Sequence, residues 1–452
     1  MSHWASRVRI WPGLVTGVIV GICCVLALNL PADAGEQDDG DSLPALNPAY
    51  APLALENRPL LLARLIAAFE RDLAILDAAN EDRDLSDAMT LYHMRRELQA
   101  CIDMWRATDS VACLDRAMIL VLYAIAAAEG NLRPLVWHGQ SRGRWPCFYL
   151  DSVAKETGGH NQLCDFQGAA GFLMVARLLD ELDVPEASQI ADFVERDIVG
   201  KWLQYNPSIG RQHLTGPDSC KYLLLVLNSG RDVREHFACI CLDLHAMGCD
   251  DYPYEEWAKL LVDLYLTLRS DPSQLAPCED RMPEQIPEDW GLTVVVGDDG
   301  VTWLSIPDFD PNSPTGVLDT SHANRTAWLA AKAYDEGLID QTIMDGLANT
   351  LYYRIWAPEK GPLYFNNYVD GSDGPLDGLE AGRGGNLWFG WHRLAACDAN
   401  IEELFLSIAY DLTNGGPNLP DGAQNKTMKE APPCFEAWAA RLLSTAPTCT
   451  FP

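Results

Sequence analysis

Apolar residues recur at intervals of three and four along most of this chain, which is the spacing of helices that bury one face. The first such segment is LLLARLIAAFERDLAILDAA, which follows Arg58. Many segments are bounded by Gly, Pro, Asp or Ser, as helix ends commonly are. Further helices are predicted at Ala88–Trp105, Leu114–Ala128, Asp165–Leu182, Ala187–Tyr205, Asp218–Leu227, Val233–Met247, Tyr254–Leu268, His322–Glu336, Gln341–Trp356, Ile401–Leu412 and Phe435–Leu443.

Two stretches depart from the helical pattern. Leu292–Ile306, LTVVVGDDGVTWLSI, has two β-type runs around a GDDG turn and predicts a hairpin, and Leu363–Val369 is a short β candidate. Because the helices follow one another without βαβ alternation, the predicted fold class is all-α. No fixed-period repeat appears, which disfavours an ordinary solenoid. We expect an (α/α)n barrel, or toroid, of antiparallel helix pairs with a small β-hairpin insertion.

The N-terminal region has the layout of an export signal. Arg7 and Arg9 precede an apolar run from Gly13 to Leu30, and Ala32-Asp33-Ala34 follows as a small-residue cleavage site. A retained membrane anchor is the alternative, because the run is nearly long enough to span a bilayer. We therefore expect a signal peptide at 1–34, a disordered acidic leader at 35–55 and a single exported domain at 56–452.

Fourteen cysteines fit an exported protein, since two lie in the signal and twelve remain. An even number in an oxidising compartment predicts disulfides. Cys101 with Cys113 and Cys434 with Cys449 are the candidates that lie near each other in sequence. No CxxC pair occurs, which argues against a cysteine metal site.

The net charge of −31 argues against nucleic acid and against anionic membrane surfaces as partners. It still allows an anionic sugar to bind in a local cationic cleft. Several loops concentrate His, Arg and aromatic residues in a chain with only 33 Lys and Arg. Indole faces can hold sugar rings while guanidinium groups pair with carboxylates. The substrate-binding candidates in these loops are Trp137, His138, Arg142, Arg144, Asn324, Arg383, Trp388 and His392.

The stretch DTSHANR, residues 319–325, runs into the Ala-rich segment TAWLAAKAYDEG. Asp319, Thr320 or Ser321 can cap this helix and leave His322 in its first turn. The positive end of the helix dipole disfavours an imidazolium there, so we expect His322 to be neutral near pH 7. A plain capping or packing role is the alternative for His322, and a solvent-facing position is the alternative for Arg325.

These residue types suit β-elimination of a polyuronide. The C5 proton of a uronate can be removed only if the adjacent carboxylate is neutralised, which Asn, Gln, His or Arg can do. A His or Tyr then takes the proton, and a Tyr can return one to the glycosidic oxygen. No GxSxG, HExxH or P-loop sequence is present, which disfavours serine esterases, zinc proteases and nucleotide-dependent enzymes.

Asn161, His213 and Tyr222 occur in that order, and nine residues separate the last two. With DTSHANR, they resemble the exported α/α-barrel polysaccharide lyases, including the alginate, glucuronan, hyaluronate and chondroitin lyases. The likeness covers about Trp137–Arg393 and does not extend to the C-terminal β-sandwich domains of the larger lyases. It implies a secreted lyase that cleaves a uronate-containing polysaccharide, of the alginate or glucuronan type, without a cofactor.

The resemblance also implies roles for individual residues. His160 and Asn161 would neutralise the uronate carboxylate. Arg325 would hold a neighbouring carboxylate or stabilise the leaving oxygen. His213 or His322 would be the base, and Tyr222 would be the acid or the shared acid and base.

Other functions stay open. A glycoside hydrolase on the same barrel needs an acid pair, with Asp151, Asp165, Asp218, Asp319 and Asp377 as candidates. A non-catalytic carbohydrate-binding or envelope scaffold protein would use Trp137, Trp145, Trp388 and Trp391 for stacking. Asp308 and Asp310 in PDFDPN are a solvated turn or a structural calcium site, although the Gly and terminal Glu of an EF-hand loop are missing.

Overall fold

A computed structural model describes residues 58–444 apart from ten short gaps. The gaps are residue 81 and the segments 216–218, 228–229, 271–289, 309–315, 361–363, 374–384, 386, 388–389 and 414–431. The predicted signal and leader therefore lie outside the described residues. So do Arg383, Trp388, Asp218, Asp310, Asp377 and Cys449.

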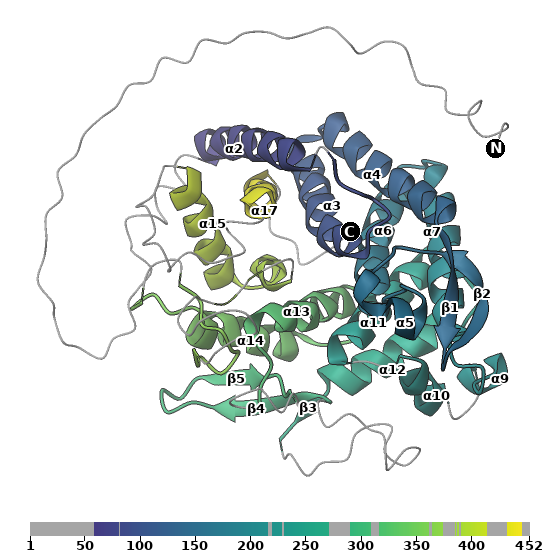
Figure 1. Ribbon diagram of the computed structural model, residues 1–452. Coiled ribbons are helices and arrows are strands. Elements are labelled where there is room, and N and C mark those ends of the chain that lie inside the picture. Colours follow the sequence, from purple (N-terminus) through teal and green to yellow (C-terminus); the bar gives the residue numbers. More distant parts are fainter. Residues whose placement is uncertain are drawn as a thin grey trace, which may run out of the picture. The chain divides into compact units, whose positions relative to one another are not determined.

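The described residues are mainly helical, which confirms the all-α fold class (Figure 1). The longer helices are α2 (Arg58–Ala79), α3 (Ala88–Thr108), α4 (Val111–Gly130), α6 (Gln162–Glu181), α7 (Glu186–Phe193), α10 (Ser219–Val226), α11 (Arg231–Ala246), α12 (Tyr254–Leu266), α13 (Thr320–Asp335), α14 (Gln341–Thr350), α15 (Ala399–Thr413) and α17 (Pro432–Ser444). The short helical turns are η1 (Asp151–Val153), α5 (Ala154–Thr157), η2 (Val194–Val199), α8 (Gly200–Leu203), α9 (Arg211–Leu214), η4 (Leu351–Ile355) and η5 (Trp391–Ala396).

Two small sheets accompany the helices. β4 (Leu292–Val296) and β5 (Thr302–Ser305) pair antiparallel, which confirms the predicted hairpin, and β3 (Leu268–Arg269) adds a parallel edge. Residues 364–369 contain only isolated bridges, so the strand predicted there is wrong. β1 (Leu132–Trp137) and β2 (Gln140–Pro146) form a second antiparallel hairpin. The sequence indicates a loop here, because the polar residues and glycine of β2 mask any period-two pattern.

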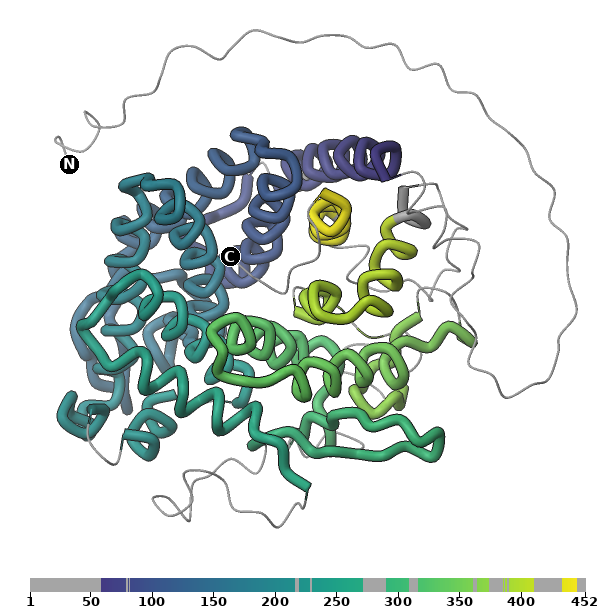
Figure 2. Tube along the Cα trace, turned by 180° about the vertical axis from the view of Figure 1, so that it is seen from behind, coloured from purple at the N-terminus to yellow at the C-terminus, as the bar shows by residue number. Residues whose placement is uncertain are grey.

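Helices α3, α6, α11 and α13 pack against one another in chain order (Figures 1 and 2). Near their N-terminal ends, Gln167 contacts Tyr92 and His236, and His236 contacts Arg325. Near their other ends, ion pairs join Arg106 to Glu181, Arg177 to Asp243 and Lys332 to Asp243. These contacts join residues that lie equally far along each helix. The four helices therefore run parallel, with their N-terminal ends at the same end of the set.

The remaining helices pack around this parallel set. α4 packs against α3, α7 against α6, and α12 against α11. Beyond α13, contacts continue to η5, from η5 to α15 and from α15 to α17. Helix α17 packs back against α3, so a path of contacts leads from α3 through the later helices and returns to it.

Helix α4 is long and apolar enough to cross a membrane, the one such helix found in the described part of the chain. Its buried positions include Ala117, Val121 and Ala124, and it packs on α3. The same length and composition also occur in core helices of soluble proteins. Length and hydropathy therefore do not make α4 a membrane span.

The predicted pairing of Cys101 with Cys113 is wrong, because both thiols are free. Cys434, the proposed partner of Cys449, is also free and donates its S–H to the backbone oxygen of Arg96 at 3.1 Å. Burial raises the pKa of the Cys101 thiol, since the charged thiolate loses its hydration. Among the described cysteines, Cys220 is disulfide-bonded.

Candidate functional site

The first turn of α13 is built as the sequence predicts, with Asp319 as its cap. Asp319 Oδ1 accepts hydrogen bonds from the backbone N–H groups of Ser321 at 2.9 Å and His322 at 3.0 Å. Asp319 Oδ2 also contacts Nδ1 of His322, whose side chain is 47% exposed. Nε2 of His322 is therefore the ring nitrogen left for a ligand.

The charge of His322 differs from the expectation. Desolvation disfavours the imidazolium, but the hydrogen bond and negative charge of Asp319 outweigh it and raise the pKa of His322 above its usual value. The helix dipole is the weaker influence because a full charge in contact exceeds a fraction of one. His322 is therefore neutral only at a pH above that raised value.

Arg325 is buried and joins three helices to α13. Its Nη2 donates to the Tyr92 hydroxyl at 2.6 Å and to Gln167 Oε1 at 3.1 Å, and its Nε lies 3.0 Å from His236 Nε2. We call Tyr92, Gln167, His236 and Arg325 the Arg325 cluster. Each member lies about one turn into its helix, so the cluster forms one polar layer beneath the N-terminal ends.

His236 is held neutral within the cluster. Its Nδ1 lies 2.9 Å from Nη1 of Arg95, so both ring nitrogens face a guanidinium group. Burial and the positive charges of Arg95 and Arg325 hold the pKa of His236 far below its usual value. Burial likewise lowers the pKa of Arg95 to about 9. Two guanidinium groups, those of Arg95 and Arg325, therefore flank the neutral His236.

Tyr92 is a functional candidate that the sequence analysis missed. It is half-buried, and its hydroxyl oxygen accepts from Arg325, so its own O–H proton is directed elsewhere. A signal was present in the sequence. Arg95, Gln99 and Asp103 follow Tyr92 at helical spacing, which gives α3 a polar stripe on a face that is buried.

His160 and Asn161, although adjacent in sequence, lie in different surroundings. Asn161 caps α6, where its Oδ1 accepts from Cys164 N at 2.9 Å, and it is half-buried. His160 is fully buried, with Lys201 Nζ 3.4 Å from its Nδ1 and the Arg133 backbone oxygen 3.4 Å from its Nε2. Burial, reinforced by the charge of Lys201, lowers the pKa of His160 to about 3. Only Asn161 is therefore placed to meet a ligand.

His213 and Tyr222 contact each other but not the Arg325 cluster. Their ring centroids are 4.5 Å apart, with His213 on α9 and Tyr222 on α10. Lys221 Nζ lies 5.8 Å from the Tyr222 ring centroid. Within the described residues, no hydrogen bond or ring contact links this pair to α13.

Asn324 and His392 have interior positions. Asn324 Oδ1 accepts from the backbone N–H groups of Gly390 at 3.0 Å and Trp391 at 3.3 Å, which ties η5 to α13. A Cβ on Gly390 would lie 1.8 Å from the Asn324 backbone oxygen, so only glycine fits there. The buried His392 ring lies 5.1 Å from the Trp438 ring. Neither side chain reaches the surface.

The other substrate-binding candidates with described positions lie on the β1–β2 hairpin. Trp137 is half-buried and packs on Tyr205 at 4.5 Å between ring centroids. His138 is exposed at the turn, Arg144 is exposed on β2 and Arg142 is half-exposed.

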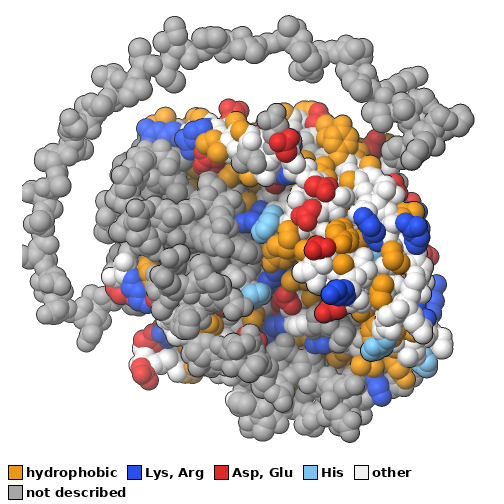
Figure 3. Space-filling model, viewed as in Figure 1, with side chains coloured by type: hydrophobic (Ala, Val, Ile, Leu, Met, Phe, Trp, Pro, Cys, Tyr) orange, Lys and Arg blue, Asp and Glu red, His pale blue; other side chains and the backbone are white. Residues whose placement is uncertain are grey.

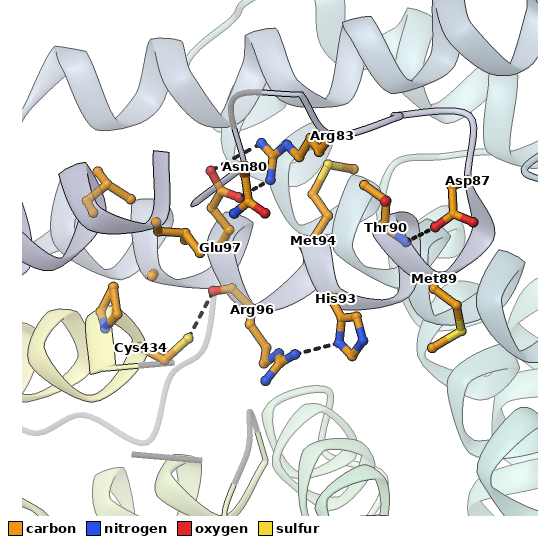
Figure 4. A pocket seen from close by; sticks show the side chains of 14 residues that line it. Asn80, Arg83, Asp87, Met89, Thr90, His93, Met94, Arg96, Glu97 and Cys434 are labelled. Carbon is orange, nitrogen blue, oxygen red and sulfur yellow. Dashed lines mark hydrogen bonds and ion pairs between the residues drawn. The ribbon is translucent and has the colours of Figure 1, made fainter. Parts of the chain in front are cut away.

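A pocket of about 330 Å³ lies between α2, α3 and the start of α17 (Figure 4). Its polar wall includes Arg83, which contacts Glu97 at 2.6 Å, and the pair His93 and Arg96. Met94 contributes to its apolar lining. His93 follows Tyr92 directly on α3, and the centroids of their rings lie 5.3 Å apart. The pocket was not predicted, because its walls come from opposite ends of the chain.

The three described carboxylates among those proposed for a hydrolase have partners within the protein. Asp165 is buried against Lys201 Nζ and Trp202 Nε1, each at 2.7 Å. Asp319 holds His322, and the exposed Asp151 accepts from the Tyr149 hydroxyl at 3.1 Å. Within the described part of the chain, no group of His, Cys, Asp and Glu is arranged to hold a metal ion.

Comparisons with protein-family models, with curated proteins and with solved structures found no match to this chain.

Proposed function

We propose that this protein is a secreted polysaccharide lyase that cleaves a uronate-containing polysaccharide, of the alginate or glucuronan type, by β-elimination. The observation that carries the proposal is the half-buried Tyr92 hydroxyl held by the buried guanidinium of Arg325. The exposed His322 lies at the same end of the parallel helices. These are the residue types that elimination needs, and no acid pair is required.

In the proposed reaction, His322 Nε2 takes the proton from C5 of the uronate. The electron pair left at C5 forms the C4–C5 double bond while the C4–O bond breaks. The Tyr92 hydroxyl gives its proton to the leaving oxygen, which becomes the hydroxyl of the new sugar end. Transfer of the proton from His322 to Tyr92 through solvent then restores both groups.

Other residues would neutralise the uronate carboxylate or position the reacting groups. Asn161 uses its Oδ1 as a helix cap, which leaves its N–H₂ group to donate to the uronate carboxylate. The N-terminal ends of α3, α6, α11 and α13 add positive potential at the same end. Arg325 is a positioning residue, because it is buried and acts on the substrate through Tyr92.

The fold that we propose for this function is an α/α toroid in a single domain. Its support is the path of contacts that leaves α3, passes through α6, α11, α13, η5 and α15, and returns through α17. The parallel direction of α3, α6, α11 and α13 fits the inner helices of such a toroid. Their connecting loops would then line one end, where Tyr92 and His322 lie.

The test is to incubate the chain from Gly35 onward with alginate, glucuronan, pectate, hyaluronan and chondroitin. Ultraviolet absorbance of the unsaturated uronate and new reducing ends are followed together. Both signals rising supports the lyase and names the substrate. Reducing ends without the chromophore would establish a hydrolase instead. Silence in both, with binding retained, would indicate a non-catalytic carbohydrate-binding protein.

A further inference from the structure

The surface arginines of this acidic protein mostly have carboxylate partners. Across the described residues, these pairs are spread over the helices and the β4–β5 hairpin. They include Arg71 with Asp72, Arg106 with Glu181, Arg116 with Asp77, Arg196 with Asp197, and Arg354 with Asp299. Such pairing is expected where 64 acidic residues accompany 33 basic ones.

Within the described residues, Arg211 and Arg234 also bond to neutral oxygens rather than to carboxylates, but they lie on separate helices, whereas the β1–β2 hairpin gathers three such arginines. Within the described residues, Arg133, Arg142 and Arg144 have no carboxylate within 4.0 Å. Their guanidinium groups bond only to neutral oxygens nearby, namely Asn131 Oδ1 at 2.9 Å, Gln140 Oε1 at 3.3 Å and the Leu132 backbone oxygen at 2.8 Å. Three positive charges are therefore left uncompensated on one hairpin of a chain whose net charge is −31.

Carboxylates on the neighbouring elements are engaged elsewhere. Asp151, which follows β2, accepts the Tyr149 hydroxyl at 3.1 Å. Glu129, at the end of α4, lies 3.9 Å from Arg196. The short helix α5, which packs on β1, presents an exposed Lys155 together with Glu156. Within the described residues, the hairpin arginines therefore keep their charges without a direct ion pair, although Asp151 and Glu156 lie on the elements that follow β2.

The backbone of the hairpin is built to hold this shape. His138 and Gly139 have φ values of 45° and 74°, as a type I′ turn requires, although His138 carries a side chain. Pro134 pairs with Arg144, but Val136 pairs with Ser141, so β2 has one extra residue at Arg142–Gly143. Gly143 has φ 97° in this bulge. Bulges redirect side chains and are built features of a fold.

The base of the hairpin reaches the end of the molecule that carries Tyr92 and His322. Beyond β2, Tyr149 N donates to Ser86 O at 2.7 Å, and Tyr149 O accepts from Ala88 N, the first residue of α3. Leu150 N donates to Gly159 O at 2.8 Å, just before α6. Figure 3 shows Lys and Arg gathered over β1 and β2 at the right-hand edge. The backbone that follows the hairpin is therefore tied to the N-terminal ends of α3 and α6, where Tyr92 and Asn161 lie.

We propose that the β1–β2 hairpin is an accessory binding surface for an acidic polysaccharide, which it holds outside the reaction site through Arg133, Arg142 and Arg144. This inference rests on the proposed function. Guanidinium groups bind carboxylates through paired hydrogen bonds, and the neighbouring Trp137 offers part of an indole face to a sugar ring. The chain's large negative charge disfavours nucleic acid, whose phosphates are far more densely spaced.

The experiment compares two double variants with the same change in net charge. Arg142→Ser/Arg144→Ser removes two unpaired charges, and Arg71→Ser/Arg196→Ser removes two exposed charges that have carboxylate partners. Binding of polyuronate chains, sulfated glycans, neutral glucan and duplex DNA is measured by calorimetry at low and physiological salt. Arg142→Lys/Arg144→Lys keeps the charge and tests for rescue, and circular dichroism confirms that each variant is folded.

We expect the hairpin double variant to bind polyuronate about tenfold more weakly than the matched control, with partial rescue by lysine. Higher salt should shrink this difference. Equal binding by the two double variants would overturn the proposal, as would no polyuronate binding or a preference for duplex DNA. Hairpin-dependent binding without unsaturated products would leave the accessory surface standing and sink the proposed lyase.

Discussion

The first turn of α13 and the α9–α10 pair each present a histidine beside a polar partner, yet their surroundings differ. His322 is fixed by Asp319 on its own helix, and three residues further along α13, Arg325 binds side chains from α3, α6 and α11. Among the described residues, the side-chain contact found for His213 is the Tyr222 ring, at 4.5 Å between ring centroids. A catalytic base needs a fixed orientation, which the first region supplies and the second does not.

The difference also appears in the charge of the two regions. Asp319 raises the pKa of His322. In the layer beneath it, the positive charges of Arg325 and Arg95 flank His236, which is neutral. Such a layer favours a substrate carboxylate and the negative charge that develops on elimination. A contact between two rings provides packing alone. A hydrogen-bond network across four helices both fixes the side chains and sets the electrostatic potential around them.

The largest expected effect tests Tyr92 against Tyr222. Tyr92→Phe should lower kcat by about 10²–10⁴, because it removes the proposed proton donor while the ring stays in place. Tyr222→Phe deletes the same hydroxyl from the other region and is the matched control. Steady-state rates of unsaturated-uronate formation measure both. An equal loss of kcat in Tyr222→Phe and Tyr92→Phe would remove the distinction between the two regions.

His322→Ala should come next, with kcat about 10²–10³ lower and substrate binding altered only a few-fold. The base would be gone, but the Arg325 cluster beneath it would remain. Substrate affinity by calorimetry and turnover by absorbance separate the two effects. A variant that keeps its turnover would show that His322 has only a structural role at the start of α13.

Asp319→Asn should move the pH profile. Asp319 raises the pKa of His322, so His322 is neutral, and able to act as the proposed base, only above that value. Asparagine still caps the helix but carries no charge, so the pKa falls and the acid limb of kcat/KM should move to lower pH. An acid limb that does not move would mean that His322 does not control it. Asp340→Asn, which changes the cap of α14, is the control.

Asn324→Ala should affect stability rather than chemistry. It would leave the buried backbone N–H groups of Gly390 and Trp391 without their acceptor, at a cost of about 2–3 kcal/mol. Urea unfolding measures the loss, and the exposed Asn400→Ala is the control. A fully stable variant with weaker substrate binding would instead restore Asn324 to the ligand-binding set.

The smallest expected effect is that of His213→Ala. Because His213 lacks contacts with the Arg325 cluster, turnover should stay within about twofold of the wild-type rate. The same absorbance assay measures it. A hundredfold loss would make the α9–α10 pair the reaction site and would remove the reason to prefer His322.

Much of the secondary structure could be predicted because its causes are local. The three- and four-residue spacing of apolar positions defines α2, α3, α11 and α13, and the GDDG turn between β-type runs defines the β4–β5 hairpin. The cap of α13 was also readable, since Asp319 bonds to residues two and three positions ahead. The β1–β2 hairpin was not predicted because β2 carries few apolar residues and a bulge interrupts the pairing, so no period-two pattern is visible.

The sequence by itself determined the helices, their caps, and the acidity of a chain that still has arginine-rich segments. Only the tertiary structure decided which polar groups meet. Arg325 and Tyr92 are 233 residues apart in the sequence. His236 and Gln167 also lie far from Arg325 in the sequence, yet both contact it. The same packing buried His160, Asn324 and His392 and left the hairpin arginines exposed. The physical reason is that periodicity fixes which face of a helix is buried, whereas the parallel alignment of four helices fixes which side chains share one layer.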